Sequence, residues 1–321
     1  MYEKADRWIF ILTCLVFASS LNFYSYADAP DFGNQVDLGL IEYAPINEAS
    51  GIAASQKNKD VLWAHNDSGD SPRVFAFNTK GKHLGVYSIA GVSNRDWEDM
   101  AVGPGPIDGE QYLYVGEIGD NNAQYDLKYI YRVPEPTVDP NQAPANTTIN
   151  GVGKIAFRYP DGRRDAETLM VDPLTKDIYI VSKREANVKV YRAPYPQSID
   201  ETVTLEHVAK LSLSQTVGGD ISTSGLEILI KTYTNVYFWR RTPEQTLWSV
   251  FADNPSPLPY SLEPQGEAIC WKADAVGYYT VSEELGGVPA HLYFYPRFDA
   301  PPTSVQPCAI LAATWAGIKS Y

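Results

Sequence analysis

Glu98-Asp99-Met100 introduces a short apolar strand, and its pattern of a small or acidic residue, one spacer and an apolar strand occurs five times in the sequence. The other four copies are Ser50-Gly51-Ile52, Glu167-Thr168-Leu169, Gly219-Asp220-Ile221 and Glu267-Ala268-Ile269. They recur at irregular intervals of roughly 50 residues, a spacing typical of proteins built from repeated supersecondary units. The chain is therefore expected to contain five similar units.

Two further segments rich in β-forming residues follow each copy of the pattern. The first of these segments is expected at Val61 to His65, Tyr112 to Gly116, Ile178 to Ser182, Glu227 to Lys231 and Gly277 to Ser282. The second, beyond a polar loop, is expected at Val74 to Phe77, Tyr129 to Val133, Val188 to Arg192, Val236 to Arg240 and His291 to Tyr295.

A fourth strand completes four of the units. It is expected at His83 to Ile89, Lys154 to Arg158, Val203 to Leu213 and Thr246 to Phe251. The fifth unit lacks one, and either Val36 to Tyr43 or Val305 to Ala312 is expected to supply it and close a ring. Four-stranded units arranged around a channel make an all-β, five-bladed β-propeller. A β-sandwich is the alternative fold, but it does not require one signature at the head of each unit.

The N-terminal segment has the features of a secretory signal peptide. A charged start precedes the apolar run Trp8 to Phe17, and small residues follow near Ala27. The run is shorter than the roughly 20 residues of a membrane-spanning helix. We therefore expect residues 1–27 to be removed and residues 28–321 to form a single propeller domain, secreted or periplasmic and monomeric. Cys270 and Cys308 then remain, and whether they form a disulfide stays open.

The formal net charge of -13 bears on the partners that the protein can bind. Nucleic acids and anionic membrane surfaces carry phosphates, which an acidic protein repels at long range. Neither is therefore expected as a partner.

In a propeller, the first strand of each blade lines the channel, so the first residues of the five patterns should form a column. The column is Ser50, Glu98, Glu167, Gly219 and Glu267. Three carboxylates in a narrow channel repel each other unless their pKa values rise or a cation lies among them. Oxygen ligands from several directions suit Ca²⁺. The expected ligands are Ser50, Glu98, Glu167, Asp220 and Glu267; alternatively, these acids accept backbone N–H groups of neighbouring blades.

Basic and acidic side chains gather in the loops at the same mouth. The basic residues are Arg73, Arg95, Arg163, Arg164, Lys183, Arg184 and Lys231. Together they suggest an anionic small molecule or glycan as the ligand; local pairing with neighbouring carboxylates is the alternative. The candidate catalytic residues are His65, Asp67, Asp70, Arg73, Arg164 and Lys183. His65 would exchange protons near neutral pH, or it is a structural hydrogen-bonding residue.

Several sequence strings add a resemblance to known families. NDSGDSPRVFAF, RDWEDMAVGP, YLYVGEIGDNN, DAETLMVDP and PQGEAI resemble segments of a secreted, mostly bacterial propeller family without a settled function. More remotely, the column is similar to that of calcium-activated nucleotidases of the apyrase type, in which serine, glutamate, glutamate, serine and glutamate hold a central Ca²⁺. This resemblance implies a calcium ion, and Gly219 departs from it.

Three functions remain as hypotheses. The first is a Ca²⁺-dependent hydrolase of phosphate esters or anhydrides, in which the metal orients water and the basic residues hold the anion. The second is a non-catalytic propeller that binds a glycan or a protein at the same mouth. The third is a lyase acting on uronate polysaccharides.

Overall fold

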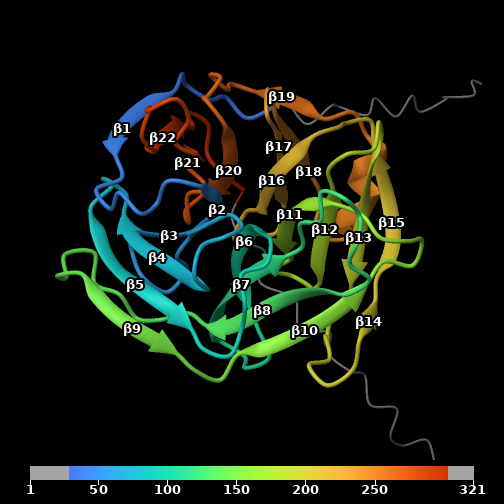
Figure 1. Ribbon diagram of the computed structural model, residues 1–321. Helices are drawn as coiled ribbons and strands as arrows, with labels where there is room; N and C mark the ends of the chain where they lie inside the picture. Colours follow the sequence, from blue (N-terminus) through green and yellow to red (C-terminus); the bar gives the residue numbers. More distant parts are fainter. Residues whose placement is uncertain (1–28, 303–321) are drawn as a thin grey trace, which may run out of the picture.

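The computed structural model describes residues 29–302, and five β-sheets surround a central axis in it (Figure 1). The expected five-bladed propeller is therefore confirmed. The expected signal peptide, Cys308 and the segment Val305 to Ala312 lie outside the described residues. No helix in the described part of the chain combines the length and the apolar character that crossing a membrane requires.

In four of the five blades the innermost strand begins with the repeated pattern, as expected; in blade 4 the pattern Gly219-Asp220-Ile221 lies at the end of the strand. These strands contact one another in order around the axis, and nearly all of their residues are buried. They are β2 (Ala49–Ala54), β6 (Trp97–Pro104), β11 (Ala166–Val171), β16 (Thr216–Ile221) and β20 (Gly266–Trp271).

The second and third strands continue each blade outward as antiparallel neighbours, and they confirm the predicted segments. The second strands are β3 (Val61–Asn66), β7 (Gln111–Glu117), β12 (Ile178–Ser182), β17 (Glu227–Thr232) and β21 (Gly277–Ser282). The third strands are β4 (Arg73–Asn78), β8 (Lys128–Pro134), β13 (Val188–Ala193), β18 (Val236–Arg240) and β22 (His291–Pro296).

The outer strands differ from the prediction in blade 4. They are β5 (His83–Ile89), β10 (Gly153–Arg158), β15 (Glu206–Leu211), β19 (Ser256–Leu258) and, in blade 5, β1 (Val36–Leu40). The strand predicted over Thr246 to Phe251 is wrong, because this segment forms the 3-10 helix η1 (Leu247–Ala252). Its buried residues Leu247, Val250 and Phe251 have helical spacing, and a half-buried strand would alternate instead.

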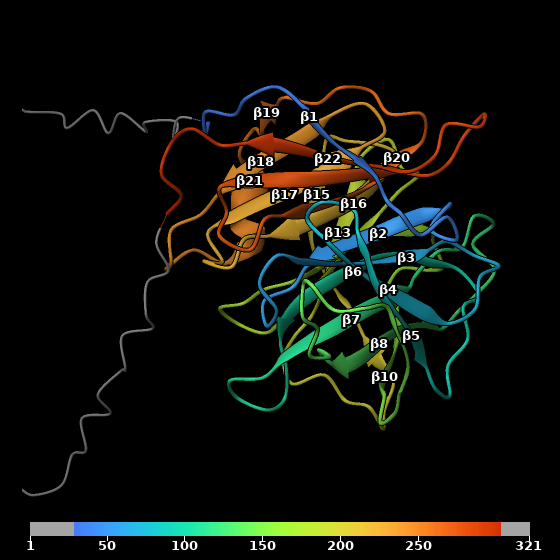
Figure 2. The same cartoon turned by 90° about the vertical axis from the view of Figure 1, so that its left-hand side faces the viewer.

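The N-terminal strand closes the ring. Strand β1 pairs antiparallel with β22, and Figure 2 shows the two lying side by side. Of the two segments proposed for closure, Val36 to Tyr43 is thus the one that supplies the strand.

Two short strands extend neighbouring blades. Strand β9 (Ala145–Ile149) pairs parallel with β5, and β14 (Val203–Thr204) pairs parallel with β10. The predicted strand Val203 to Leu213 is therefore divided, with its first residues on blade 2 and β15 on blade 3.

Apolar side chains fill the space between adjacent blades, and each pair of neighbours shares one cluster. Trp63 of blade 1 and Trp97 and Tyr131 of blade 2, for example, are fully buried in a common cluster. Burying one such side chain contributes about 1.5–3 kcal/mol to the free energy of folding. The inner ends of the blades are thereby held at fixed positions around the axis.

Candidate functional site

A β-bulge at the start of each inner strand creates the residues that face the channel. In blade 2, Trp97 and Asp99 pair with consecutive residues of β7, so Glu98 between them is the extra residue. A bulge re-aims its extra residue and leaves it outside the ladder. The extra residues in the five blades are Ser50, Glu98, Glu167, Val217 and Glu267.

The bulge in blade 4 corrects the predicted column. Its fourth member is Val217, and Gly219 lies two residues further along β16. The repeated pattern aligned Gly219-Asp220 with Glu98-Asp99, but the strand begins earlier, at Thr216. Blade 4 therefore contributes no polar side chain to the column itself.

Tyr233, in the loop after β17, supplies the missing polar group from outside the strand. Its hydroxyl donates to Glu267 Oε1 at 2.7 Å and accepts a hydrogen bond from Lys183 Nζ at 2.9 Å. Lys183 also donates to Glu167 Oε1. On the other side, Ser50 Oγ donates to the backbone oxygen of Glu98 at 2.6 Å and lies 3.4 Å from Glu267 Oε2. Side chains of all five blades thus meet around the axis.

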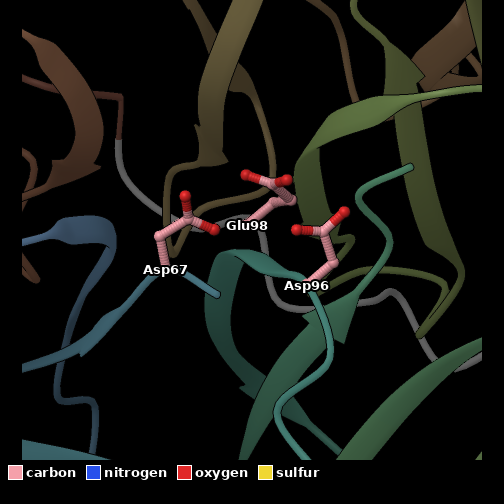
Figure 3. A group of neighbouring side chains, drawn as sticks. All are labelled: Asp67, Asp96 and Glu98. Carbon is pink, nitrogen blue, oxygen red and sulfur yellow. The ribbon is translucent and has the colours of Figure 1, made fainter. Parts of the chain in front are cut away.

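Three carboxylates at the mouth of the channel form a first acidic group, the acidic triad of Asp67, Asp96 and Glu98 (Figure 3). One oxygen from each carboxylate lies within 4.8 Å of the others. Asp67 follows β3 and Asp96 directly precedes β6, so loops of blades 1 and 2 bring the triad together. Figure 3 shows the three carboxylates directed toward a common space.

Glu98 also belongs to a second group, with Asp165 and Glu167, whose oxygens likewise lie within 4.8 Å of one another. We call Asp165 and Glu167 the inner acidic pair. The mouth therefore contains five neighbouring carboxylates, and Glu98 joins the two groups.

Burial and mutual repulsion raise the pKa of each member of the triad. Desolvation is the largest cause for Glu98, which is only 3% exposed, and its repulsion from Glu167 adds to it, so that its pKa lies well above the usual value. Desolvation and the charge of Glu267 raise the pKa of Asp67 to about 6. The pKa of Asp96 is raised by burial and by Asp165. At neutral pH, the triad is thus poised to take up protons or a cation.

Gly119 permits this close approach. A Cβ atom at this position would collide with Glu98 Oε1 and would lie 2.6 Å from Asp96 Oδ2. The loop after β7 therefore passes the triad closely only because residue 119 has no side chain.

The basic residues at the mouth are engaged by carboxylates, which favours the local-pairing alternative. The ion pairs are Arg73 with Asp70, Arg95 with Glu117, Arg163 with Asp126, Arg164 with Asp161 and Glu185, Lys183 with Glu167, and Arg184 with Asp165. Lys231 is buried and donates to the backbone oxygens of Thr232 and Gly266. These residues do not form an open ring of positive charge.

The two acidic groups differ in their counter-charges. Lys183 pairs with Glu167, and Arg184 Nε lies 2.6 Å from Asp165 Oδ2. Burial alone would lower the pKa of Lys183, but the Glu167 carboxylate outweighs it and raises that pKa. In the described part of the chain, no Lys, Arg or His forms an ion pair with Asp67, Asp96 or Glu98.

His65 lies beneath the mouth surface. Its side chain is fully buried, it packs edge-on against Trp97, and Nδ1 lies 2.9 Å from the backbone oxygen of Asn66. Burial lowers the pKa of His65 to about 4, so the ring is neutral at physiological pH and Nδ1 donates this hydrogen bond. The structural alternative for this residue is thus the one that the geometry supports.

Asp70 and Arg73 lie together at the rim. Arg73 Nη2 donates to Asp70 Oδ1 at 2.8 Å, and Nε contacts both oxygens of the same carboxylate. The pair lines an open pocket of about 320 Å³ with Asn47, Glu48 and Asn66.

Arg164 lies on another part of the rim. It contacts Asp161 and Glu185 and lies over the rings of Tyr159 and Tyr191. Neither Arg73 nor Arg164 forms an ion pair with a carboxylate of the two acidic groups.

Asp220 and Asp99 use their oxygens to join blades. Asp220 accepts the N–H groups of Ile221 and Trp271, each at 2.8 Å, and Asp99 accepts those of Met100, Leu169 and Gly219. The structure does not bring Asp220 into either acidic group. The backbone-acceptor alternative therefore describes these two residues.

The donor set fits a hard divalent cation. The triad offers three carboxylates as ligands, and the Ser50 hydroxyl and the backbone oxygen of Glu98 are further oxygens nearby. No histidine or cysteine belongs to either acidic group. Oxygen-only sites select Ca²⁺ or Mg²⁺ over zinc. In the inner acidic pair, Glu167 Oε2 is buried and has no hydrogen-bond partner among the described residues.

The sequence interpretation missed three members of the mouth as site residues. They are Asp96, Asp165 and Tyr233, none of which the sequence analysis names as a candidate site residue. A signal for the first two exists, because each lies two residues before the bulged glutamate of its blade. Tyr233 has no such signal, since its role follows from the position of a loop.

Comparison with known proteins yields distant structural likenesses. No family model and no curated protein matches the sequence. A chain of Kuenenia stuttgartiensis hydrazine synthase is similar at a TM-score of 0.42 and 13% identity, covering 80% of this chain and 97% of its own. The Dos1 propeller gives 0.38 and 7%, covering 83% and 95%. A chain of a nidogen/laminin complex gives 0.45 and 12%, covering 75% and 74%.

These low values carry no argument about activity, and the propeller assignment rests on the strand pairing described above. The resemblance to secreted bacterial propellers and to calcium-activated nucleotidases stays a prediction.

Proposed function

We propose that this propeller binds one divalent cation, Ca²⁺, at the acidic triad and uses it to hold an anionic or hydroxyl-bearing ligand at the mouth. The observation that carries the proposal is the lack of an ion pair at the triad within residues 29–302. Three carboxylates with raised pKa values share one space without an ion pair, whereas protein cations neutralise the adjacent inner acidic pair.

The magnitude of the repulsion supports a cation. Two unit charges about 4 Å apart repel by about 4 kcal/mol at the effective dielectric constant that suits protein sites. A divalent ion removes this cost and replaces it with attraction. Because Ca²⁺ accepts about 6 to 8 oxygens, three carboxylates leave positions for water and for ligand oxygens.

Binding without catalysis is the better supported role. The predicted base, His65, is buried, and the predicted anion-binding residues are paired with carboxylates. A ligand would therefore be recognised mainly through the ion and through polar groups at the rim. Among ligand classes, sugars with carboxylate or phosphate substituents and phosphate esters suit such a site.

Hydrolysis of phosphate esters or anhydrides is the second candidate. The observation that favours it is the open side of the triad, where Asp67 and Asp96 are only partly buried. Asp67 Oδ1 accepts the N–H of Ser68, and no hydrogen bond to Asp67 Oδ2 is found within residues 29–302. A water molecule beside the triad would find an acceptor there.

Export of the protein belongs to the same proposal, and its expected signal peptide, residues 1–27, lies outside the described residues. Calcium sites of extracellular modules have dissociation constants on the order of 10⁻⁴–10⁻³ M, and we expect a value in that range.

Calorimetric titration of the purified full chain with CaCl₂ tests the proposal. We expect one ion per chain, and at least a tenfold loss of affinity in Asp96→Asn because one charged ligand is removed. Asp126→Asn is the matched control, because Asp126 lies exposed in the loop between β7 and β8 and outside the triad. Equal calcium affinity in the two variants would refute the proposed site.

The same samples separate binding from turnover. Nucleoside triphosphates, sugar phosphates and uronate oligosaccharides are offered in calcium and in EGTA. Calcium-dependent binding without release of phosphate supports the binding module, and calcium-dependent release of phosphate establishes the hydrolase.

A further inference from the structure

We infer that Lys183 is a built-in cation that fills the inner end of the acidic cluster and limits the mouth to a single divalent ion. This inference rests on the proposed cation site and adds its stoichiometry. It also explains why the ion belongs at the triad and not on the axis of the channel.

The contacts of Lys183 place its ammonium among the channel carboxylates. The side chain is 7% exposed and its Nζ donates to Glu167 Oε1 and to the hydroxyl of Tyr233. The Tyr233 hydroxyl in turn donates a hydrogen bond to Glu267 Oε1, and the centre of its ring lies 5.0 Å from Lys183 Nζ. One ammonium therefore joins blades 3, 4 and 5, as a metal ion on the axis would.

The remaining oxygens of the inner end show what the ammonium excludes. Glu167 Oε2 is buried without a hydrogen-bond partner in residues 29–302, and Glu98 and Asp165 belong to the same acidic group. These oxygens are suitable ligands for a second ion. A positive charge beside them at short range repels such an ion.

Lys183→Met tests the inference, because methionine keeps an unbranched side chain and removes the charge. Calorimetry with CaCl₂ should give one ion per chain for the wild type and two for Lys183→Met. Tyr233→Phe is the matched control: it removes the bridging hydroxyl but keeps the ammonium, so one ion should remain. A stoichiometry of one in folded Lys183→Met overturns the inference.

Glu167→Gln provides a second arm if Lys183→Met does not fold. Glu167 holds Lys183 and not the ion, so this variant should keep one ion with less than about a tenfold change in affinity, the lower bound for residues that support metal ligands. Loss of calcium binding in Glu167→Gln would place the ion at the inner end and overturn the inference.

The failures of the two proposals are distinguishable. If the wild type binds one ion and folded Lys183→Met also binds one, the inference about Lys183 is wrong and the proposed function stands. If neither binds calcium, both are wrong.

Discussion

The acidic triad and the inner acidic pair are adjacent and chemically alike, yet they differ in their counter-charges. Lys183 and Arg184 neutralise the inner pair, and the triad has no ion pair in the described part of the chain. In the proposed site, the ion lies where the protein's own cations leave carboxylates without an ion pair, and not wherever carboxylates are close together.

The largest effect is expected for Glu98→Gln, because Glu98 belongs to both groups. We expect calcium affinity to fall by on the order of 100-fold or more, beyond the effect of a supporting residue. The metal-free protein should nevertheless melt at a higher temperature, because a buried and repelled charge is removed. Scanning calorimetry in EGTA measures the second effect. A lower melting temperature would show that the Glu98 charge stabilises the fold.

A smaller loss is expected for Gly119→Ala, which pushes Glu98 and Asp96 apart without changing any charge. Calcium affinity should fall by about tenfold, in the range seen when the surroundings of metal ligands are disturbed. Gly116→Ala on β7 is the control, since its Cβ would meet the Asp99 backbone and Ile118 and not the triad. Equal affinities in both variants would mean that the triad tolerates a wider separation.

The buried carboxylates of the propeller also predict an unusual pH dependence. Burial raises the pKa of Glu283 to about 8 and that of Asp220 to about 7, and the pKa of Glu98 is raised as well. The folded protein thus binds more protons than the unfolded chain, so stability falls as pH rises toward about 8. His65, with its lowered pKa, affects stability below about pH 6.5, and Lys231, whose pKa is lowered to about 8, affects it above about pH 8.

Metal-free protein should therefore melt higher at pH 6.5 than at pH 8, by about 5 °C. Calcium should reduce this difference in melting temperature, because protons compete with the ion at the triad. Melting curves in EGTA and in 100-fold excess of calcium over Kd, a condition worth about 2.7 kcal/mol, check both expectations. A metal-free protein that is more stable at pH 8 would contradict the raised pKa values.

The smallest effect is expected for Arg164→Ala at the rim. Its partly exposed ion pairs with Asp161 and Glu185 contribute at most about 1 kcal/mol, and the residue lies outside both acidic groups. Calcium affinity should stay within about threefold. A larger change, measured in the same titration, would mean that the rim cations reach the triad.

The blade pattern was predictable from the sequence, because strands of alternating or continuously apolar residues recur with one signature. The predicted second and third strands match those of the structure closely, and the ring closes with one of the two proposed segments. The error at η1 has a physical cause: Leu247, Val250 and Phe251 bury one helical face, but in a short apolar segment the helical and strand patterns are easily confused.

The site was predictable only in part. Glu98 and Glu167 were recognised as channel residues, because in their blades the bulged residue is the first residue of the repeated pattern. The fourth column residue was predicted as Gly219 instead of Val217, because the position of a bulge depends on how the inner strand pairs with the second strand. The pairing of Lys183 and the burial of His65 depend on contacts between blades, which no local pattern contains.

The closing pair β1–β22 has a consequence for the order of events during synthesis. Strand β1 leaves the ribosome before any other described strand, but its partner β22 is made after all the others. Blade 5 therefore stays incomplete until translation of the propeller has nearly finished, and the long sequence separation of this pair slows its formation. If the chain is exported, it can cross the membrane before its ring is sealed.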